Sequence, residues 1–141
     1  MSESTPFLGE KGRVVCEVLG QRLARKSDGR DEVVAAFAAL FERTWRDLGL
    51  MVGAKGVSSV MQRARRLARG GQPAVELVKV NDRAVHLEAL QGSELTPNAI
   101  RDGLTEVFVT TMEIMASLIG YDLVAPLVQG IEAELRMRGL I

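Results

Sequence analysis

The chain of 141 residues contains one cysteine, one histidine and few aromatic residues, and each scarcity excludes a class of function. A single cysteine, Cys16, cannot form a disulfide within the chain or a Cys-x-x-Cys redox pair. Zinc sites built from one chain usually need several histidine or cysteine ligands, so most metal sites of this kind are excluded. Aromatic residues make up 4% of the chain, which leaves little material for stacking nucleic-acid bases. We therefore expect neither a metal nor another cofactor.

Charge of one sign and long hydrophobic runs are also missing. The 18 basic residues balance 18 acidic residues, which argues against a surface built as a whole for nucleic acid or anionic lipid. The longest apolar run, Val33 to Phe41, has nine residues, far fewer than the roughly 20 that span a bilayer. The segment from Met1 to Lys11 lacks the apolar core of a signal peptide. Together with the lone cysteine, these features predict a soluble cytoplasmic protein without a membrane partner.

What the chain does contain is the composition of one globular domain, with 47% hydrophobic and 26% charged residues. Five stretches show the periodicity of amphipathic helices, at about 10–26, 31–48, 51–69, 97–119 and 122–135. We predict a mainly α, single-domain bundle of about five helices over residues 10–138, after a flexible N-terminus of residues 1–9. The alanine-rich start of the second stretch favours a central position for that helix.

Apolar spacing assigns the buried faces of these helices. In the first helix the pattern places Val15, Leu19 and Leu23 in the core, with Cys16 as a small core residue beside them. In the helix at 97–119 the predicted buried face is Ile100, Leu104, Val107, Phe108, Met112, Met115, Leu118 and Ile119.

Residues that favour helix ends set the predicted boundaries. Asp31 and Asp122 are expected to cap the starts of two helices, and Gly49 is expected to end the second. Thr96-Pro97 combines a capping residue with a proline in the first turn, which predicts a helix start at that point. Pro126 then has to lie in the first turn of the last helix.

Residues 75–88 allow two interpretations. Apolar residues on either side of Asn81-Asp82 predict a short β-hairpin, because both residues tolerate the backbone of a tight turn. Two short helical turns around a loop are the alternative, and we favour the hairpin.

A basic segment without acidic residues covers the predicted third helix, with Lys55, Arg63, Arg65, Arg66 and Arg69. One hypothesis is a docking surface for phosphate, nucleic acid or an acidic partner. The favoured interpretation is a solvated face whose charges pair with acidic residues elsewhere in the same fold. An intermediate interpretation is self-association, in which basic residues of one copy meet acidic residues of another. Nucleic acid is the less favoured partner, because the total charge is balanced.

Gly49 to Ser58 contains glycines, a lysine and a serine, as a phosphate-binding loop does. The order differs from the Walker pattern, and no strand precedes the segment. We expect these glycines to allow a sharp turn between two helices instead.

His86 is the one imidazole of the chain. No nucleophile-elbow motif accompanies it, so a catalytic triad is not indicated. A globin-like haem or small-ligand sensor with His86 as the ligand is an alternative function, since chain length and helical content are compatible with it. A structural histidine is the favoured interpretation.

Three carboxylates, Asp102, Glu106 and Glu113, share one face of the helix at 97–119. A carboxylate-bridged metal site would also require histidines at helical spacing, which are absent. We therefore predict a solvated face.

Two segments resemble an uncharacterised group of bacterial helical proteins associated with signalling and ATPase genes. One runs from Leu48-Gly49 through Gly53, Gly56, Arg63-Ala64 and Leu67 to Pro73, and the other comprises Ile114 to Ile119, Gly120, Leu123 and Leu127. Pro126 and the segment 78–85 depart from the pattern of that group. The resemblance implies an all-helical, adaptor-like module without catalytic residues.

The leading hypothesis is a non-enzymatic interaction domain in bacterial regulation that acts through helix faces. Its partner is a second copy, as in a homodimer, or another protein. No convergent catalytic set is present, which favours binding over catalysis.

Overall fold

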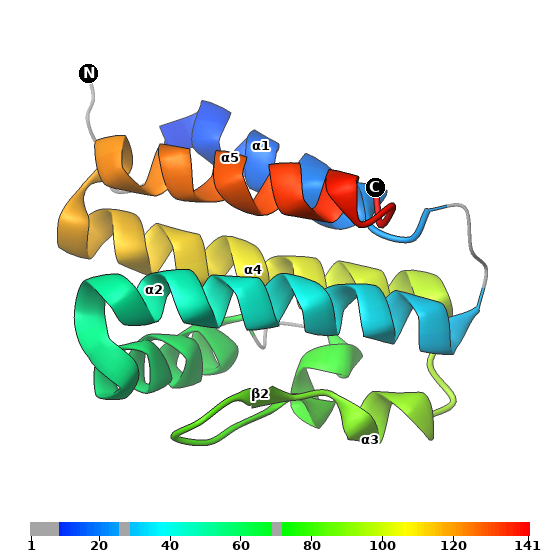
Figure 1. Ribbon diagram of the computed structural model, residues 1–141. Helices are drawn as coiled ribbons and strands as arrows, with labels where there is room; N and C mark the ends of the chain where they lie inside the picture. The colour runs from blue at the N-terminus through cyan, green and yellow to red at the C-terminus, as the bar shows by residue number, and fades with distance from the viewer. Residues whose placement is uncertain (1–8, 26–28, 69–71) are drawn as a thin grey trace.

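The computed structural model describes residues 9–25, 29–68 and 72–141 and shows a helical bundle with one short β-hairpin (Figure 1). The helices and strands are α1 (Gly9–Arg22), α2 (Arg30–Leu67), the 3-10 helix η1 (Pro73–Leu77), β1 (Lys79–Val80), β2 (Val85–His86), α3 (Glu88–Gln91), α4 (Pro97–Ile119) and α5 (Tyr121–Met137). The predicted mainly α bundle of about five helices with a hairpin is confirmed. Most of the predicted flexible N-terminus lies outside the described residues. None of the described helices is both long and apolar enough to cross a membrane.

The central helix is α4. Thr96 caps it by accepting a hydrogen bond from the backbone N–H of Ala99 at 3.1 Å, and Pro97 lies in the first turn, as predicted. The helix packs against α1, α2, α5 and η1 and runs through the middle of the bundle (Figure 1). The sequence pointed to α2 for this place, but Ala35 and Ala38 of α2 are exposed. Alanine favours a helix at any burial, so a run of alanines does not locate the core.

The buried face of α1 lies against α4. Cys16, Leu19 and Leu23 are buried, whereas Val15, which was predicted to be buried, is about half exposed. Gly20 lies on the buried face, and a Cβ atom there would stand 2.3 Å from Thr105 Oγ1 of α4. Apolar periodicity is read from large side chains. It therefore misses a helix face on which a glycine allows two helices to pack closely.

The long helix α2 bends at Gly53 and not at Gly49. Residues 30–67 are helical apart from Gly53, whose φ of 79° and ψ of 165° turn the chain back on itself. The predicted end of a helix at Gly49 is therefore wrong, although the predicted sharp turn within 49–58 is present. At the start of α2, Gly29 is the N-cap and Asp31 lies in the first turn, where its charge favours the helix dipole.

The hairpin interpretation of residues 75–88 is confirmed over a shorter range. Lys79 pairs with His86 and Val80 with Val85 in antiparallel register. The turn is held by Asn81 Oδ1, which accepts hydrogen bonds from the backbone N–H groups of Arg83 (2.8 Å) and Ala84 (3.0 Å). Asparagine stabilises such turns through its own side chain, and here it makes up for the missing glycine.

α5 begins at a glycine instead of an aspartate cap. Gly120, with a φ of 93°, is the N-cap, and Asp122 in the first turn makes no capping hydrogen bond. Pro126 lies inside the helix, beyond the first turn to which the sequence assigned it. The helix ends at Met137, with Arg138 as its C-cap. Gly139 follows with a φ of 75°, and the N–H of Leu140 donates to the carbonyl oxygen of Leu135 at 2.9 Å.

Candidate functional site

The basic segment on the second half of α2 is open to solvent. Lys55, Arg63 and Arg66 are exposed and form no ion pair within the described residues. Arg65 is half buried: its Nε donates to the carbonyl oxygen of Val78 at 2.7 Å and its Nη2 to that of Glu76 at 3.2 Å. Arg69 lies outside the described residues. The described arginines of this segment therefore do not form one exposed surface, because Arg65 is bound to the backbone of residues 76 and 78.

A polar groove of about 440 Å³ lies between this segment and the hairpin, lined by Gln62, Arg65, Arg66, Val78, Lys79 and Val80. Lys79 was not among the predicted site residues, because it is the β1–β2 pairing that brings residue 79 beside α2. Arg65 is held by neutral carbonyl groups, so these hydrogen bonds do not cancel its charge. The groove thus gathers three cations from two elements.

The acidic residues of α4 pair with α1 and not with the basic segment. Arg13 Nη1 lies 2.8 Å from Glu113 Oε1, and Arg13 Nη2 lies 3.1 Å from Glu106 Oε2. Gln21 donates to Asp102 at 2.9 Å. The prediction of a solvated face at these three carboxylates holds only in part, because Glu106 and Glu113 pair with Arg13 of α1 and keep 33% and 28% of their side-chain surface exposed.

Charges on the first half of α2 pair with α5. Arg43 donates to Asp47 at 2.7 Å and also to Glu134. Arg46 donates to the same Glu134 oxygen at 3.1 Å. The hydrogen bond from Arg43 holds the pKa of Glu134 below its ordinary value. The expected pairing of opposite charges within one molecule therefore occurs, but through other arginines than those of the basic segment.

His86 lies on β2 and is 40% exposed at its side chain. Its Nε2 is 2.8 Å from the side-chain nitrogen of Asn81. Because Asn81 Oδ1 accepts two backbone N–H groups, its amide nitrogen donates and His86 Nε2 accepts. None of the four cavities described here is lined by His86, and the described residues hold no group of three or more potential metal ligands. Haem or small-ligand binding by His86 stays a prediction that this geometry does not favour.

The Gly49–Ser58 segment is part of the bent helix. Ser58 is buried, and its hydroxyl donates to the carbonyl oxygen of Asn81 at 3.0 Å. A phosphate-binding serine needs a free hydroxyl, whereas this one attaches α2 to the hairpin. The segment matches the predicted tight turn between two helical halves.

Cys16 is a core residue, as predicted. Its side chain is 1% exposed, and burial raises the pKa of its thiol to about 12. A thiol that stays protonated is a poor nucleophile, so Cys16 is not a reactive site.

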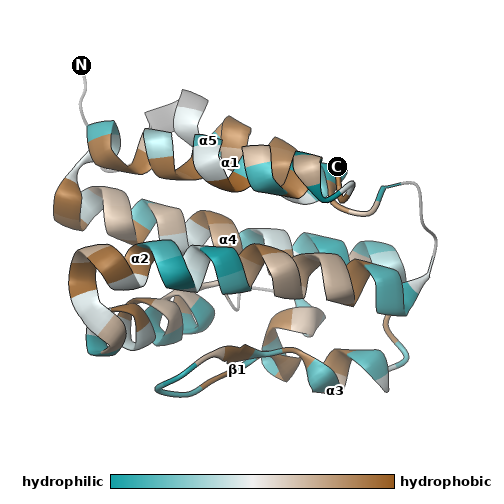
Figure 2. Ribbon diagram, viewed as in Figure 1, coloured by the Kyte–Doolittle hydropathy of each residue, from teal (hydrophilic) through white to brown (hydrophobic). Residues whose placement is uncertain are grey.

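An apolar end surface lies where α1 begins, α2 bends and α4 meets α5. Figure 2 shows hydrophobic residues at the α4–α5 turn and at the bend of α2. Leu50 is 85%, Leu118 61% and Leu123 52% exposed. We use the name apolar end surface for the six exposed residues Val15, Leu50, Met51, Leu118, Tyr121 and Leu123.

Two separate hollows lie beside five of these six residues, and Leu118 lines neither of them. A groove of about 360 Å³ between α2 and α5 joins Leu50 and Met51 to Leu123, and a small cavity of about 70 Å³ joins Val15 to Tyr121. The sequence places Val15 and Leu118 in the core, but both are exposed, because periodicity alone cannot distinguish an apolar side chain that faces the core from one that faces solvent.

Comparison of the chain with protein-family models, with curated proteins and with solved structures finds no match in any of the three. The resemblance to a bacterial helical group is therefore without support from these comparisons.

Proposed function

We propose that this protein is a non-enzymatic interaction module that forms a homodimer through its apolar end surface. The resemblance to bacterial signalling-associated proteins gives the proposal a regulatory setting in the cytoplasm. The observation that carries it is the groove between α2 and α5 at this end of the bundle, which is lined by the exposed side chains of Leu50, Met51 and Leu123. Contiguous apolar patches on soluble proteins commonly mark interaction sites.

Covering this surface is energetically favourable. Each leucine or methionine side chain removed from water contributes about 1.5–3 kcal/mol. Leu50 and Leu123 stand on either side of the groove between α2 and α5, so a partner seated there contacts both. These two side chains are expected to contribute most.

The charges beside the groove favour a second copy over a charged partner. Arg43 and Asp47 are the charged residues that line it, and they form an ion pair with each other at 2.7 Å. A two-fold interface brings the same patch from both copies together, so an uncompensated charge on one copy would repel the identical charge on the other. A surface without net charge avoids this repulsion.

Sedimentation velocity over a range of protein concentrations tests the proposal. We expect a dimer in the unmodified protein and a monomer when Leu50→Asp and Leu123→Asp are combined, because the double variant should weaken association by about 100-fold or more. Met137→Asp is the control, because Met137 is 88% exposed but lies at the other end of α5. A monomeric unmodified protein, or a double variant that still dimerises, would overturn the proposal.

A second candidate function is binding of an acidic protein segment in the polar groove. Arg66 and Lys79 line this groove from two elements and have no ion-pair partner in the described parts of the chain. The few aromatic residues and the zero net charge favour an acidic peptide over nucleic acid.

Binding of an oligoglutamate peptide at several salt concentrations tests this second candidate. Combined Arg66→Glu and Lys79→Glu should abolish a salt-sensitive interaction, whereas Arg83→Glu, at the exposed hairpin turn, should largely retain it. Unchanged binding by the double variant, or tighter binding of a DNA duplex than of the peptide, would exclude an acidic-peptide site.

A further inference from the structure

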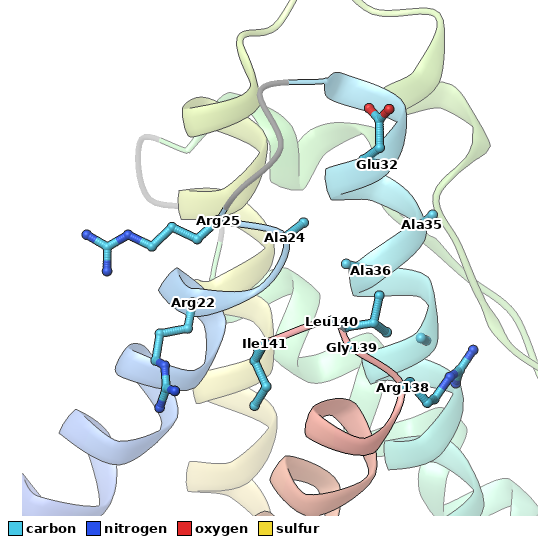
Figure 3. Close-up of a pocket in the computed structure, with 11 residues that line it drawn as sticks. Arg22, Ala24, Arg25, Glu32, Ala35, Ala36, Arg138, Gly139, Leu140 and Ile141 are labelled. Carbon is cyan, nitrogen blue, oxygen red and sulfur yellow. The ribbon is translucent and has the colours of Figure 1, made fainter.

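The largest of the cavities described here lies where α1 ends and α2 begins, remote from the apolar end surface (Figure 3). Its volume is about 700 Å³, within the usual range for small-molecule sites. Ala35, Ala36 and Ala39 of α2 form one wall, and Leu140 and Ile141 form part of the other. The cavity is thus lined by aliphatic side chains from the start of α2 and from the residues that follow α5.

The backbone around this cavity is fixed in an unusual conformation. Ala24, which lines it, has a φ of 50° and is the one described residue other than glycine with a positive φ. Its N–H donates to the carbonyl oxygen of Leu140 at 2.9 Å. Its own carbonyl oxygen accepts a hydrogen bond from Arg101, a buried side chain of α4, at 3.3 Å. Backbone held in an unfavourable region is concentrated at functional sites, where surrounding contacts maintain it.

Three arginines and one acidic residue line the mouth of the cavity: Arg22, Arg25, Arg138 and Glu32. Arg22 pairs with Glu132 at 3.9 Å and Arg138 with Glu134 at 3.5 Å. Figure 3 shows the side chains of Arg22 and Arg25 extending from the end of α1 away from the alanine wall. Arg25 is exposed and forms no ion pair among the described residues. The cavity therefore offers an apolar interior and, at its mouth, the unpaired charge of Arg25.

We propose that this cavity binds a long-chain carboxylate, with its hydrocarbon chain against the alanine wall and its carboxylate near Arg25. Apart from the charged residues at the mouth, the lining residues that the structure describes have no hydrogen-bonding side chain. A sugar or a nucleoside would leave its polar atoms unpaired there, which is costly. An alkyl chain has no such atoms, and a carboxylate is a strong partner for arginine. The site is separate from the surface proposed for dimerisation.

Isothermal titration calorimetry with dodecanoate tests the site. Ala35→Phe should fill the cavity from an exposed position and weaken binding by at least about tenfold, whereas Ala38→Phe, on an exposed position of the same helix outside the cavity, should not. Arg25→Glu should weaken binding by about tenfold, because it reverses the charge that faces the carboxylate. Circular dichroism establishes that each variant is folded.

Three further results decide the proposal. Dodecyltrimethylammonium should bind more weakly than dodecanoate, and equal binding would overturn the choice of an anionic ligand. The combination of Leu50→Asp and Leu123→Asp should leave dodecanoate binding unchanged, and loss of binding would move the ligand to the apolar end surface. Absence of dodecanoate binding to the unmodified protein, or binding that is insensitive to Ala35→Phe, would overturn the proposal while leaving dimerisation to be judged by its own experiment.

Discussion

Gly20 of α1 and Thr105 of α4 meet so closely that a Cβ atom on residue 20 would stand 2.3 Å from Thr105 Oγ1 and 2.9 Å from Thr105 Cβ. Thr105 is buried, and its hydroxyl has no hydrogen-bond partner in the described part of the chain. The absence of a side chain at residue 20 therefore determines how near the two helices lie.

Gly20→Ala is expected to lower the free energy of unfolding by about 1–3 kcal/mol, because the added methyl group overpacks the contact with a short, β-branched side chain. Urea denaturation followed by circular dichroism measures the change. Gly92→Ala is the control, because a Cβ atom at residue 92 meets nothing within 4 Å. Combining Gly20→Ala with Thr105→Ala should recover part of the loss, and equal effects of the two glycine variants would contradict the expected contact.

Gly49 and Gly53 should respond to alanine in opposite directions. Gly53 has a φ of 79° and a ψ of 165°, a region that essentially only glycine occupies, so Gly53→Ala should destabilise the protein by about 1–3 kcal/mol. Gly49 is helical, and its nearest contact would be Val57 Cγ2 at 3.9 Å, so Gly49→Ala should stabilise it by about 0.5–1 kcal/mol. Thermal and urea unfolding measure both. A loss at residue 49 with none at residue 53 would place the bend at Gly49.

Some local signals in the sequence predicted local structure, whereas Asp31 and Asp122 lie in first turns and are not the caps that the sequence predicted. Thr96-Pro97 marks the start of α4, and Asn81 stabilises the hairpin turn, because capping and turn formation depend on residues a few positions apart. Local signals could not decide whether the bend of α2 lies at Gly49 or at Gly53. Both glycines permit a bend, and the one that bends is selected by how the two halves of α2 pack.

The candidate sites depend on contacts between distant segments, so the sequence located them incompletely. Arg65 and Arg66 were recognisable from a run of cations, but Lys79 joins them through a strand pairing. Val15 has the spacing of a core residue and faces outward, because Cys16 and Gly20 provide the contact with α4. Ala24 carries no sequence signal for its positive φ, which Arg101 and Leu140 maintain from other parts of the chain.

Cys16 should be unreactive in the folded protein. Burial raises the pKa of its thiol from 9.0 to about 12, so at pH 8 a thiol reagent such as Ellman's should react slowly until the protein unfolds. The same shift makes stability depend on pH. Above pH 9 the unfolded chain releases a proton that the folded chain retains, so the contribution of Cys16 is complete below this value and declines as the pH rises towards 12.

A variant without the thiol separates this contribution from other groups that titrate in alkali. Cys16→Ala should show a shallower loss of stability between pH 9 and pH 11 than the unmodified protein, measured by urea unfolding at each pH. Rapid labelling of Cys16 in the folded protein, at the rate seen in urea, would contradict its burial.

Glu134 should titrate below the usual range of a glutamate and return towards it when Arg43 is replaced. The hydrogen bond from Arg43 is the main cause that lowers its pKa, and the charge of Arg46 adds to it. Because the folded-state pKa is the lower one, the contribution of Glu134 to stability is present above the unfolded value. It is lost as the pH falls through the folded value.

Carboxyl chemical shifts of Glu134 in a pH titration by NMR measure this directly. Arg43→Met should raise the pKa of Glu134, but not fully to its ordinary value, because Arg46 still donates to the same carboxylate at 3.1 Å. Arg136→Met is the matched control: Arg136 pairs with Glu132 at 2.7 Å and not with Glu134, so the pKa of Glu134 should stay where it was. If both variants moved the pKa of Glu134 equally, the shift would arise from the general positive charge near α5, and Arg43 would not be the residue that joins α2 to α5.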